Sequence, residues 1–81
     1  NKIVTVTLLL EHKNGVLSSV LNTISNDAGS VLTINQGIPL QGVASTTISI
    51  ETVHLSIDLE ALLDKIRMVD GVKRLEVLGQ A

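Results

Sequence analysis

The sequence contains no cysteine, phenylalanine, tyrosine or tryptophan, and it has one proline among 81 residues. Without cysteine the chain forms no disulfide and holds no iron–sulfur cluster or thiolate metal site, so we expect no metal and no cofactor. Without aromatic side chains it lacks the surface on which nucleic-acid bases stack, and a formal charge of -2 provides no attraction to phosphates. We therefore expect no nucleic-acid partner.

Long apolar runs are absent as well. The chain has no stretch of about eighteen apolar residues and no signal peptide, so we expect a cytoplasmic protein without membrane contact. It begins at Asn1 without a methionine, and we expect it to be the carboxyl-terminal part of a longer protein.

The residues that are present predict one small aliphatic domain. Hydrophobic residues make up 44% of the chain, and in the absence of aromatic side chains Leu, Ile and Val must build the core. A chain of this size buries only about 60 to 65% of its unfolded surface. With no disulfide to supplement the core, we expect a homodimer or a higher homo-oligomer.

The pattern changes from strand to helix periodicity at Gly15. Residues 3–10 are β-branched and leucine residues with alternating threonines, which predicts a strand. Apolar residues then recur at helical spacing from Val16 onward, and the helix continues to Ala28. Gly29 is the predicted left-handed residue that closes it.

A second strand is predicted over residues 31–40, with Leu32, Ile34, Ile38 and Leu40 on one face. Because Pro39 has no N–H to donate, this strand should lie at a sheet edge. Gln41-Gly42 is typical of a tight turn into a third strand, which carries hydroxyl side chains on its other face.

The last third of the chain predicts a helix and a strand. Asp58 is the expected N-cap of a helix with an apolar stripe, Gly71 ends it, and residues 72–78 form the final strand. The order βαββαβ predicts an α+β, ferredoxin-like sandwich, with a four-stranded antiparallel sheet and two helices on one face.

The loop before the first helix is the candidate ligand site. The N–H groups at the start of a helix lack partners, and the helix dipole is positive there, so Val16 and Leu17 can receive a carboxylate or phosphate. His12, Asn14 and Gly15 complete the predicted loop wall, although each also has an ordinary structural explanation. Gly15 suits a positive φ, and Asn14 suits the N-cap or the residue before it.

Two amides in the predicted edge strand are the second candidate feature. Asn35 and Gln36 interrupt an apolar run, and amides must find hydrogen bonds if they are buried. They fit a ligand or interface role and a bulge around Gly37 equally well.

The loop and the second strand resemble the ACT domain, a small regulatory module of amino-acid metabolism. The resemblance is carried by the loop His12-Lys13-Asn14-Gly15-Val16-Leu17 and the strand Leu32-Thr33-Ile34-Asn35-Gln36, and it covers almost the whole chain. The nearest resemblance is to the PheB-like group of small bacterial ACT-domain proteins.

This resemblance implies a regulatory domain that binds an amino acid, usually between protomers, in a pathway linked to phenylalanine or other aromatic amino acids. The loop carries no acidic residue to hold an ammonium group, which favours an aromatic or branched-chain ligand. The implied ligand-binding residues are His12, Asn14, Gly15, Val16 and Leu17, together with Asn35 and Gln36.

Two other functions stay open. The domain can be a dimerisation module without a ligand. It can also be an enzyme, since the PheB-like group includes proteins labelled as chorismate mutases. That reaction needs several cationic side chains around a dianion, whereas the two arginines, Arg67 and Arg74, are far in sequence from the loop. We therefore assign no catalytic residue.

Overall fold

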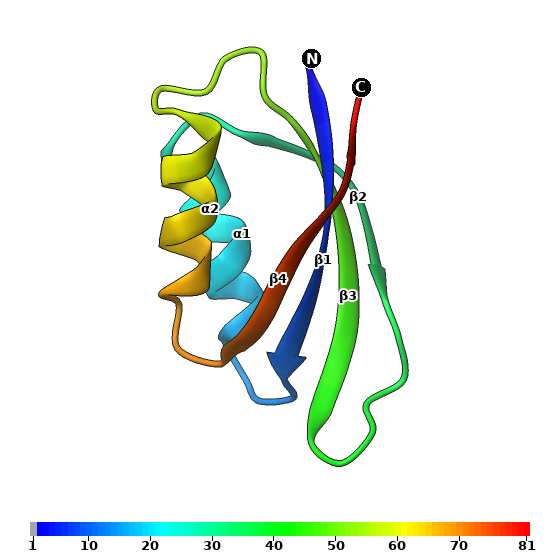
Figure 1. Ribbon diagram of the computed structural model, residues 1–81. Helices are drawn as coiled ribbons and strands as arrows, with labels where there is room; N and C mark the ends of the chain where they lie inside the picture. Colours follow the sequence, from blue (N-terminus) through cyan, green and yellow to red (C-terminus); the bar gives the residue numbers. More distant parts are fainter. Residues whose placement is uncertain (1) are drawn as a thin grey trace.

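The fold is a two-layer sandwich with both helices on one face of a four-stranded antiparallel sheet (Figure 1). The computed structural model describes residues 2–81. In chain order, the elements are β1 (Ile3–Glu11), α1 (Val16–Asn26), β2 (Ser30–Gln36), β3 (Val43–Glu51), α2 (Leu59–Arg67) and β4 (Val72–Gln80). The sheet order β2-β3-β1-β4 confirms the predicted ferredoxin-like fold.

The core lies between the two layers and follows from strict alternation in the central strands. Every second residue of β1 from Val4 to Leu10 is buried, and so is every second residue of β3 from Ala44 to Ile50. Both helices turn apolar stripes onto this face; their buried residues are Val16, Val20, Ile24, Leu62, Leu63 and Ile66. Aliphatic side chains alone thus fill the helix side of the sheet, with one exception at position 46.

The helix ends show one correction. Asp58 is the N-cap of α2, as predicted, although its side chain makes no cap hydrogen bond. By contrast, α1 ends at Asn26, and the left-handed residue after it is Ala28, with φ 65°, rather than Gly29. Gly29 is required for a different reason, because a Cβ there would lie 2.7 Å from Cγ2 of Ile24.

The second strand is an edge strand, as predicted, but it is shorter than residues 31–40. β2 ends at Gln36, and beyond it only Leu40 forms a bridge, to Val43, across the turn at residues 41–42. A bulge between Val31 and Thr33 inserts a residue and interrupts the alternation. The predicted common face is therefore wrong: its members Leu32, Ile34, Ile38 and Leu40 are all exposed, and the last two lie outside β2.

The exception in the core is Thr46, which is fully buried on the helix side of β3 between Leu8 and Gln36. Its Oγ1 has no hydrogen-bond partner among residues 2–81. Because a buried hydroxyl without a partner forfeits its hydration, we expect Thr46→Val to raise the free energy of unfolding by about 1 kcal/mol. Urea unfolding of both proteins measures this change, and a less stable variant would show that the hydroxyl has a stabilising role.

Candidate functional site

The β1–α1 loop presents free backbone donors. Gly15 is the N-cap of α1 in the left-handed region, with φ 88°, and no side chain caps the helix. The Ser19 N–H donates to the Gly15 carbonyl at 2.9 Å, while the Val16 N–H reaches the Lys13 carbonyl only at 3.5 Å. Within residues 2–81 the N–H groups of Leu17 and Ser18 have no backbone acceptor. These two donors therefore face outward at the positive end of the helix dipole.

A cleft of about 390 Å³ lies at this loop. The lining residues are Lys13, Asn14, Gly15, Val16, Ser19 and Asp70. Asp70 comes from the turn between α2 and β4, which lies beside the β1–α1 loop at the same end of the molecule (Figure 1). The cleft therefore brings together an amide, a hydroxyl and one charged side chain of each sign next to the first turn of α1.

Close packing fixes the two turns against each other. Gly71 has φ 101°, and a Cβ on it would lie 2.6 Å from Cγ2 of Val16. The Glu11 N–H donates to the Gly71 carbonyl at 2.8 Å, which ties the end of β1 to the same turn. The close approach to Val16 leaves no room for a side chain at position 71. The packing of Gly71 on Val16 therefore determines the position of Asp70 relative to the start of α1.

The structure brings together part of the predicted loop site. Asn14, Gly15 and Val16 line the cleft, whereas His12 and Leu17 do not. His12 is exposed and its N–H donates to the Gly42 carbonyl at 2.8 Å. The Leu17 side chain packs against the core, and its backbone N–H lies in the first turn of α1, next to the lining residue Val16.

The two predicted amides lie elsewhere. Asn35 pairs with Thr47 and Gln36 with Thr46, so the two side chains point to opposite faces of the sheet. Both are exposed on β2, and neither lines the loop cleft of its own chain. Any contact between these amides and a ligand in that cleft would have to come from a second protomer.

Sequence reasoning missed Lys13, Ser19 and Asp70 as cleft residues. Ser19 follows Ser18 in the first turn of α1, where both serines are equally good candidates until the helix is oriented. Asp70 is far from the loop in sequence, and its only signal was its place directly before the helix-ending Gly71.

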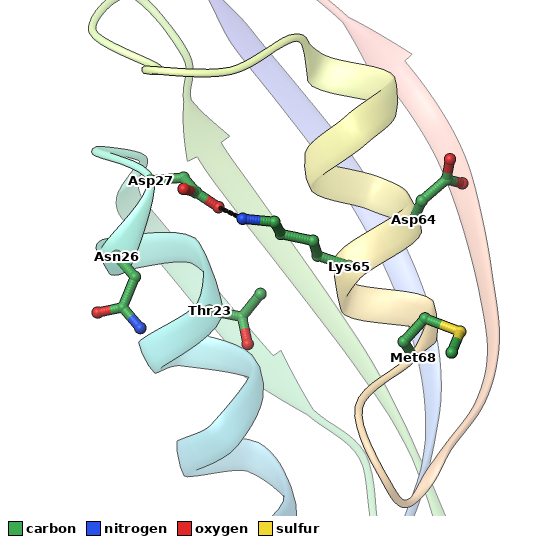
Figure 2. A pocket seen from close by; sticks show the side chains of 6 residues that line it. All are labelled: Thr23, Asn26, Asp27, Asp64, Lys65 and Met68. Atoms are coloured by element: carbon green, nitrogen blue, oxygen red, sulfur yellow. Dashed lines mark hydrogen bonds and ion pairs between the residues drawn. The ribbon is translucent and has the colours of Figure 1, made fainter.

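A second cleft, of about 430 Å³, lies on the outer side of the two helices (Figure 2). Most of its polar side chains already pair with the protein: Lys65 Nζ lies 3.0 Å from Asp27 Oδ2, and Thr23 donates to the Ser19 carbonyl at 2.8 Å. Asp64 accepts from Arg67 at 2.9 Å. The loop cleft, which lies next to the unpaired N–H groups at the start of α1, is the better candidate for a ligand.

Residues 2–81 contain neither a metal-binding cluster nor a membrane-spanning helix. No three His, Asp or Glu side chains gather closely enough there to hold a metal ion. In the same part of the chain, neither helix has the length and apolarity needed to span a membrane.

Comparison with known proteins identifies the domain. The chain is 51% identical over 80 residues to a UPF0735 ACT domain-containing protein of Carboxydothermus hydrogenoformans. The aligned region covers 99% of this chain and 55% of that protein. It is 53% identical over 79 residues to the protein of the same name from Desulforamulus reducens, and this alignment covers 98% of the chain and 53% of the relative. The chain thus spans about half the length of these curated relatives. No protein-family model matches it.

Solved structures agree on the fold. The ACT domain from GTP pyrophosphokinase of Chlorobium tepidum superposes with a TM-score of 0.74 at 25% identity, covering 95% of this chain and 97% of that one. The ligand-free regulatory subunit of aspartate kinase from Thermus thermophilus gives a TM-score of 0.65 at 18% identity, covering 93% and 50%.

The strand order, the helix-opening loop and these relatives define one class of protein, and the chain belongs to the ACT domains. Within that class its sequence is similar to the UPF0735 ACT domain-containing proteins. ACT domains are commonly regulatory, ligand-binding modules.

Proposed function

We propose that this domain is a non-catalytic regulatory module that binds a free amino acid in the β1–α1 cleft. The observation that carries this proposal is the pair of unpartnered N–H groups of Leu17 and Ser18 in the first turn of α1, next to a cleft lined by Val16, Ser19 and Asp70. The helix donors suit a carboxylate, and the Asp70 carboxylate suits an ammonium group. An amino acid carries both groups on one carbon.

The class of side chain follows from the resemblance to the PheB-like group, which supports an aromatic amino acid such as phenylalanine. The inference of an apolar ligand from the lack of an acidic residue in the loop has to take Asp70 into account. The loop itself has no acidic residue, but the α2–β4 turn brings one to the cleft, so the ammonium group has a candidate partner. The ligand class therefore depends on the apolar contacts beyond the charged ends rather than on a missing acid.

A thermal-shift panel tests this function. A ligand that binds only the native state stabilises it by RT ln(1 + [L]/Kd), so phenylalanine, leucine and serine should separate by side-chain class. For an amino acid that responds, the corresponding amine without the carboxylate and the acid without the amine should both give smaller shifts. A flat panel would count against amino-acid binding.

Asp70→Asn tests whether the amino acid binds in the β1–α1 cleft. Loss of a charged hydrogen-bond partner is worth roughly 1.5 to 3 kcal/mol, so we expect about tenfold or greater weakening of amino-acid binding. Asp64→Asn is the matched control, because Asp64 is an exposed carboxylate of α2 that pairs with Arg67 outside this cleft. Equal weakening by both variants would place the ammonium group elsewhere.

We also propose that the domain forms a homodimer through β2. Ser30–Gln36 contains no charged residue and exposes Leu32 and Ile34, so it offers an unprotected sheet edge. The opposite edge, β4, carries Lys73, Arg74 and Glu76 and pairs with β1 through two register shifts. Both edges contain an irregular register, but only β4 carries charged side chains, which discourage edge pairing, and this favours β2.

Ile34→Lys tests the β2 interface. Ile34 pairs with Ile48 of β3 and is 40% exposed. A lysine at position 34 would place an ammonium group in the proposed interface. We expect sedimentation to show a dimer for the parent and a monomer for this variant at micromolar concentration. Leu78→Lys on β4 is the control and should remain dimeric. A monomeric parent would contradict the proposal.

A further inference from the structure

We propose that Asn14 is a site of spontaneous deamidation in the folded protein, which converts a neutral amide at the opening of α1 into a carboxylate. The proposal rests on the Asn14-Gly15 junction and on its exposure in the folded domain. It concerns the chemistry of the loop itself and does not depend on a bound ligand.

Both reacting groups are accessible. Asn14 is exposed and provides no cap hydrogen bond to α1, so its side-chain amide is not held by the helix. The Gly15 N–H has no backbone acceptor within residues 2–81. A Cβ at Gly15 would meet nothing within 4 Å, so the space beside this residue is open.

The reaction is a cyclisation followed by hydrolysis. The Gly15 backbone nitrogen loses its proton and attacks the side-chain amide carbon of Asn14, forming a new N–C bond. The bond from that carbon to the amide nitrogen breaks, and ammonia leaves with the proton. Water then adds to either carbonyl of the resulting succinimide. The ring opens to aspartate or to isoaspartate, in which the main chain runs through the former side chain.

Asp70-Gly71 is a second junction that is able to form a succinimide, and its reactivity can be compared with that of Asn14-Gly15 in the same protein. There Gly71 is buried, a Cβ would lie 2.6 Å from Val16, and its carbonyl accepts the Glu11 N–H at 2.8 Å. The carbonyl of Gly15 also accepts a hydrogen bond, from the Ser19 N–H at 2.9 Å, so the difference lies in packing: Val16 holds the Gly71 backbone in place, whereas Gly15 is exposed and lies against open space. We therefore expect reaction at position 14 and not at position 70.

The remaining asparagines of the described chain lie in regular structure and precede larger residues. They are Asn22, Asn26 and Asn35. The side chain of each following residue crowds the backbone nitrogen, and helix or strand hydrogen bonds restrain it. These positions serve as internal controls in the same sample.

The product would change the candidate site, and this consequence rests on the proposed function. A carboxylate at position 14 lies beside the free N–H groups of Leu17 and Ser18, which are the proposed donors for the ligand's carboxylate. The protein's own negative charge then competes with that of the ligand. We expect aged protein to lose amino-acid response in proportion to conversion.

Peptide mapping of folded protein incubated in mildly alkaline buffer tests the proposal. We expect the peptide containing Asn14 to gain the mass of amide-to-acid conversion and to separate into aspartate and isoaspartate forms. The peptides containing the other described asparagines should keep their mass, and the Asp70 peptide should give a single form. Asn14→Gln should lose the conversion at this position, because a longer side chain does not close the five-membered ring.

The unfolded chain provides the reference rate. If Asn14 converts in urea but remains intact in the folded protein, the fold protects the loop and the proposal is overturned. Conversion in folded protein with a flat amino-acid panel would support the modification and refute the proposed function. An amino-acid response in a protein whose Asn14 stays intact would do the reverse.

Discussion

Gly71→Ala is expected to lower the free energy of unfolding by about 2 to 5 kcal/mol, combining a left-handed alanine with an overpacked contact. Gly71 has φ 101°, and its added Cβ would lie 2.6 Å from Cγ2 and 3.0 Å from Cγ1 of Val16. Val16 is buried at the start of α1, so it has little room to move. Urea or thermal unfolding followed by circular dichroism measures the loss.

Gly15→Ala is the matched control for this prediction. Gly15 has φ 88°, similar to Gly71, but no atom lies within 4 Å of its added Cβ. It should therefore suffer only the backbone cost of about 1 to 2 kcal/mol. Val16→Ala removes the two methyl groups nearest Gly71 and should reduce the additional cost of Gly71→Ala in a double-mutant cycle. Equal costs at the two glycines would show that packing against Val16 is unimportant.

Gly15→Val is expected to weaken amino-acid binding about tenfold or more while the protein stays folded. The side chain has open space around Cβ and lies within the lining of the cleft, so it should occupy ligand volume rather than protein volume. Loss of charged hydrogen bonds of roughly 1.5 to 3 kcal/mol each makes the expected weakening about tenfold or more. Calorimetric titration of the variant against the parent measures it.

Gly42→Val separates the loss of the site from the strain of a β-branched residue at positive φ. Gly42 has φ 82° and open space around its Cβ, but it lies in the turn between β2 and β3, outside the lining of the cleft. It should lose similar stability and keep full binding. If Gly15→Val is folded and binds as tightly as the parent, the site is not at this loop.

Local periodicity was sufficient to predict most of the fold. The alternation in β1 and the apolar stripes of both helices are properties of neighbouring residues, and their burial confirms the predicted sheet and helix faces. The errors lie where long-range packing decides. A bulge in β2 changes the register, and contact with Ile24 explains a glycine at position 29 that does not adopt a positive φ.

The candidate site divides in the same way. Asn14, Gly15 and Val16 were predictable because a strand-to-helix junction is visible in a short stretch of sequence. Asp70 was not, because it reaches the cleft only through the contact of the next residue with Val16. Asn35 and Gln36 were expected at the site, but β2 places them outside the cleft of their own chain.

The most direct test is an amide-resolved NMR titration of the isotope-labelled protein with the amino acid that gives the largest thermal shift. The N–H groups of Leu17 and Ser18 are unpartnered in the free domain, so a bound carboxylate should move their signals most, and the Asp70→Asn variant should weaken this response. If an amino acid binds while these two signals stay in place, the start of α1 is not the ligand site.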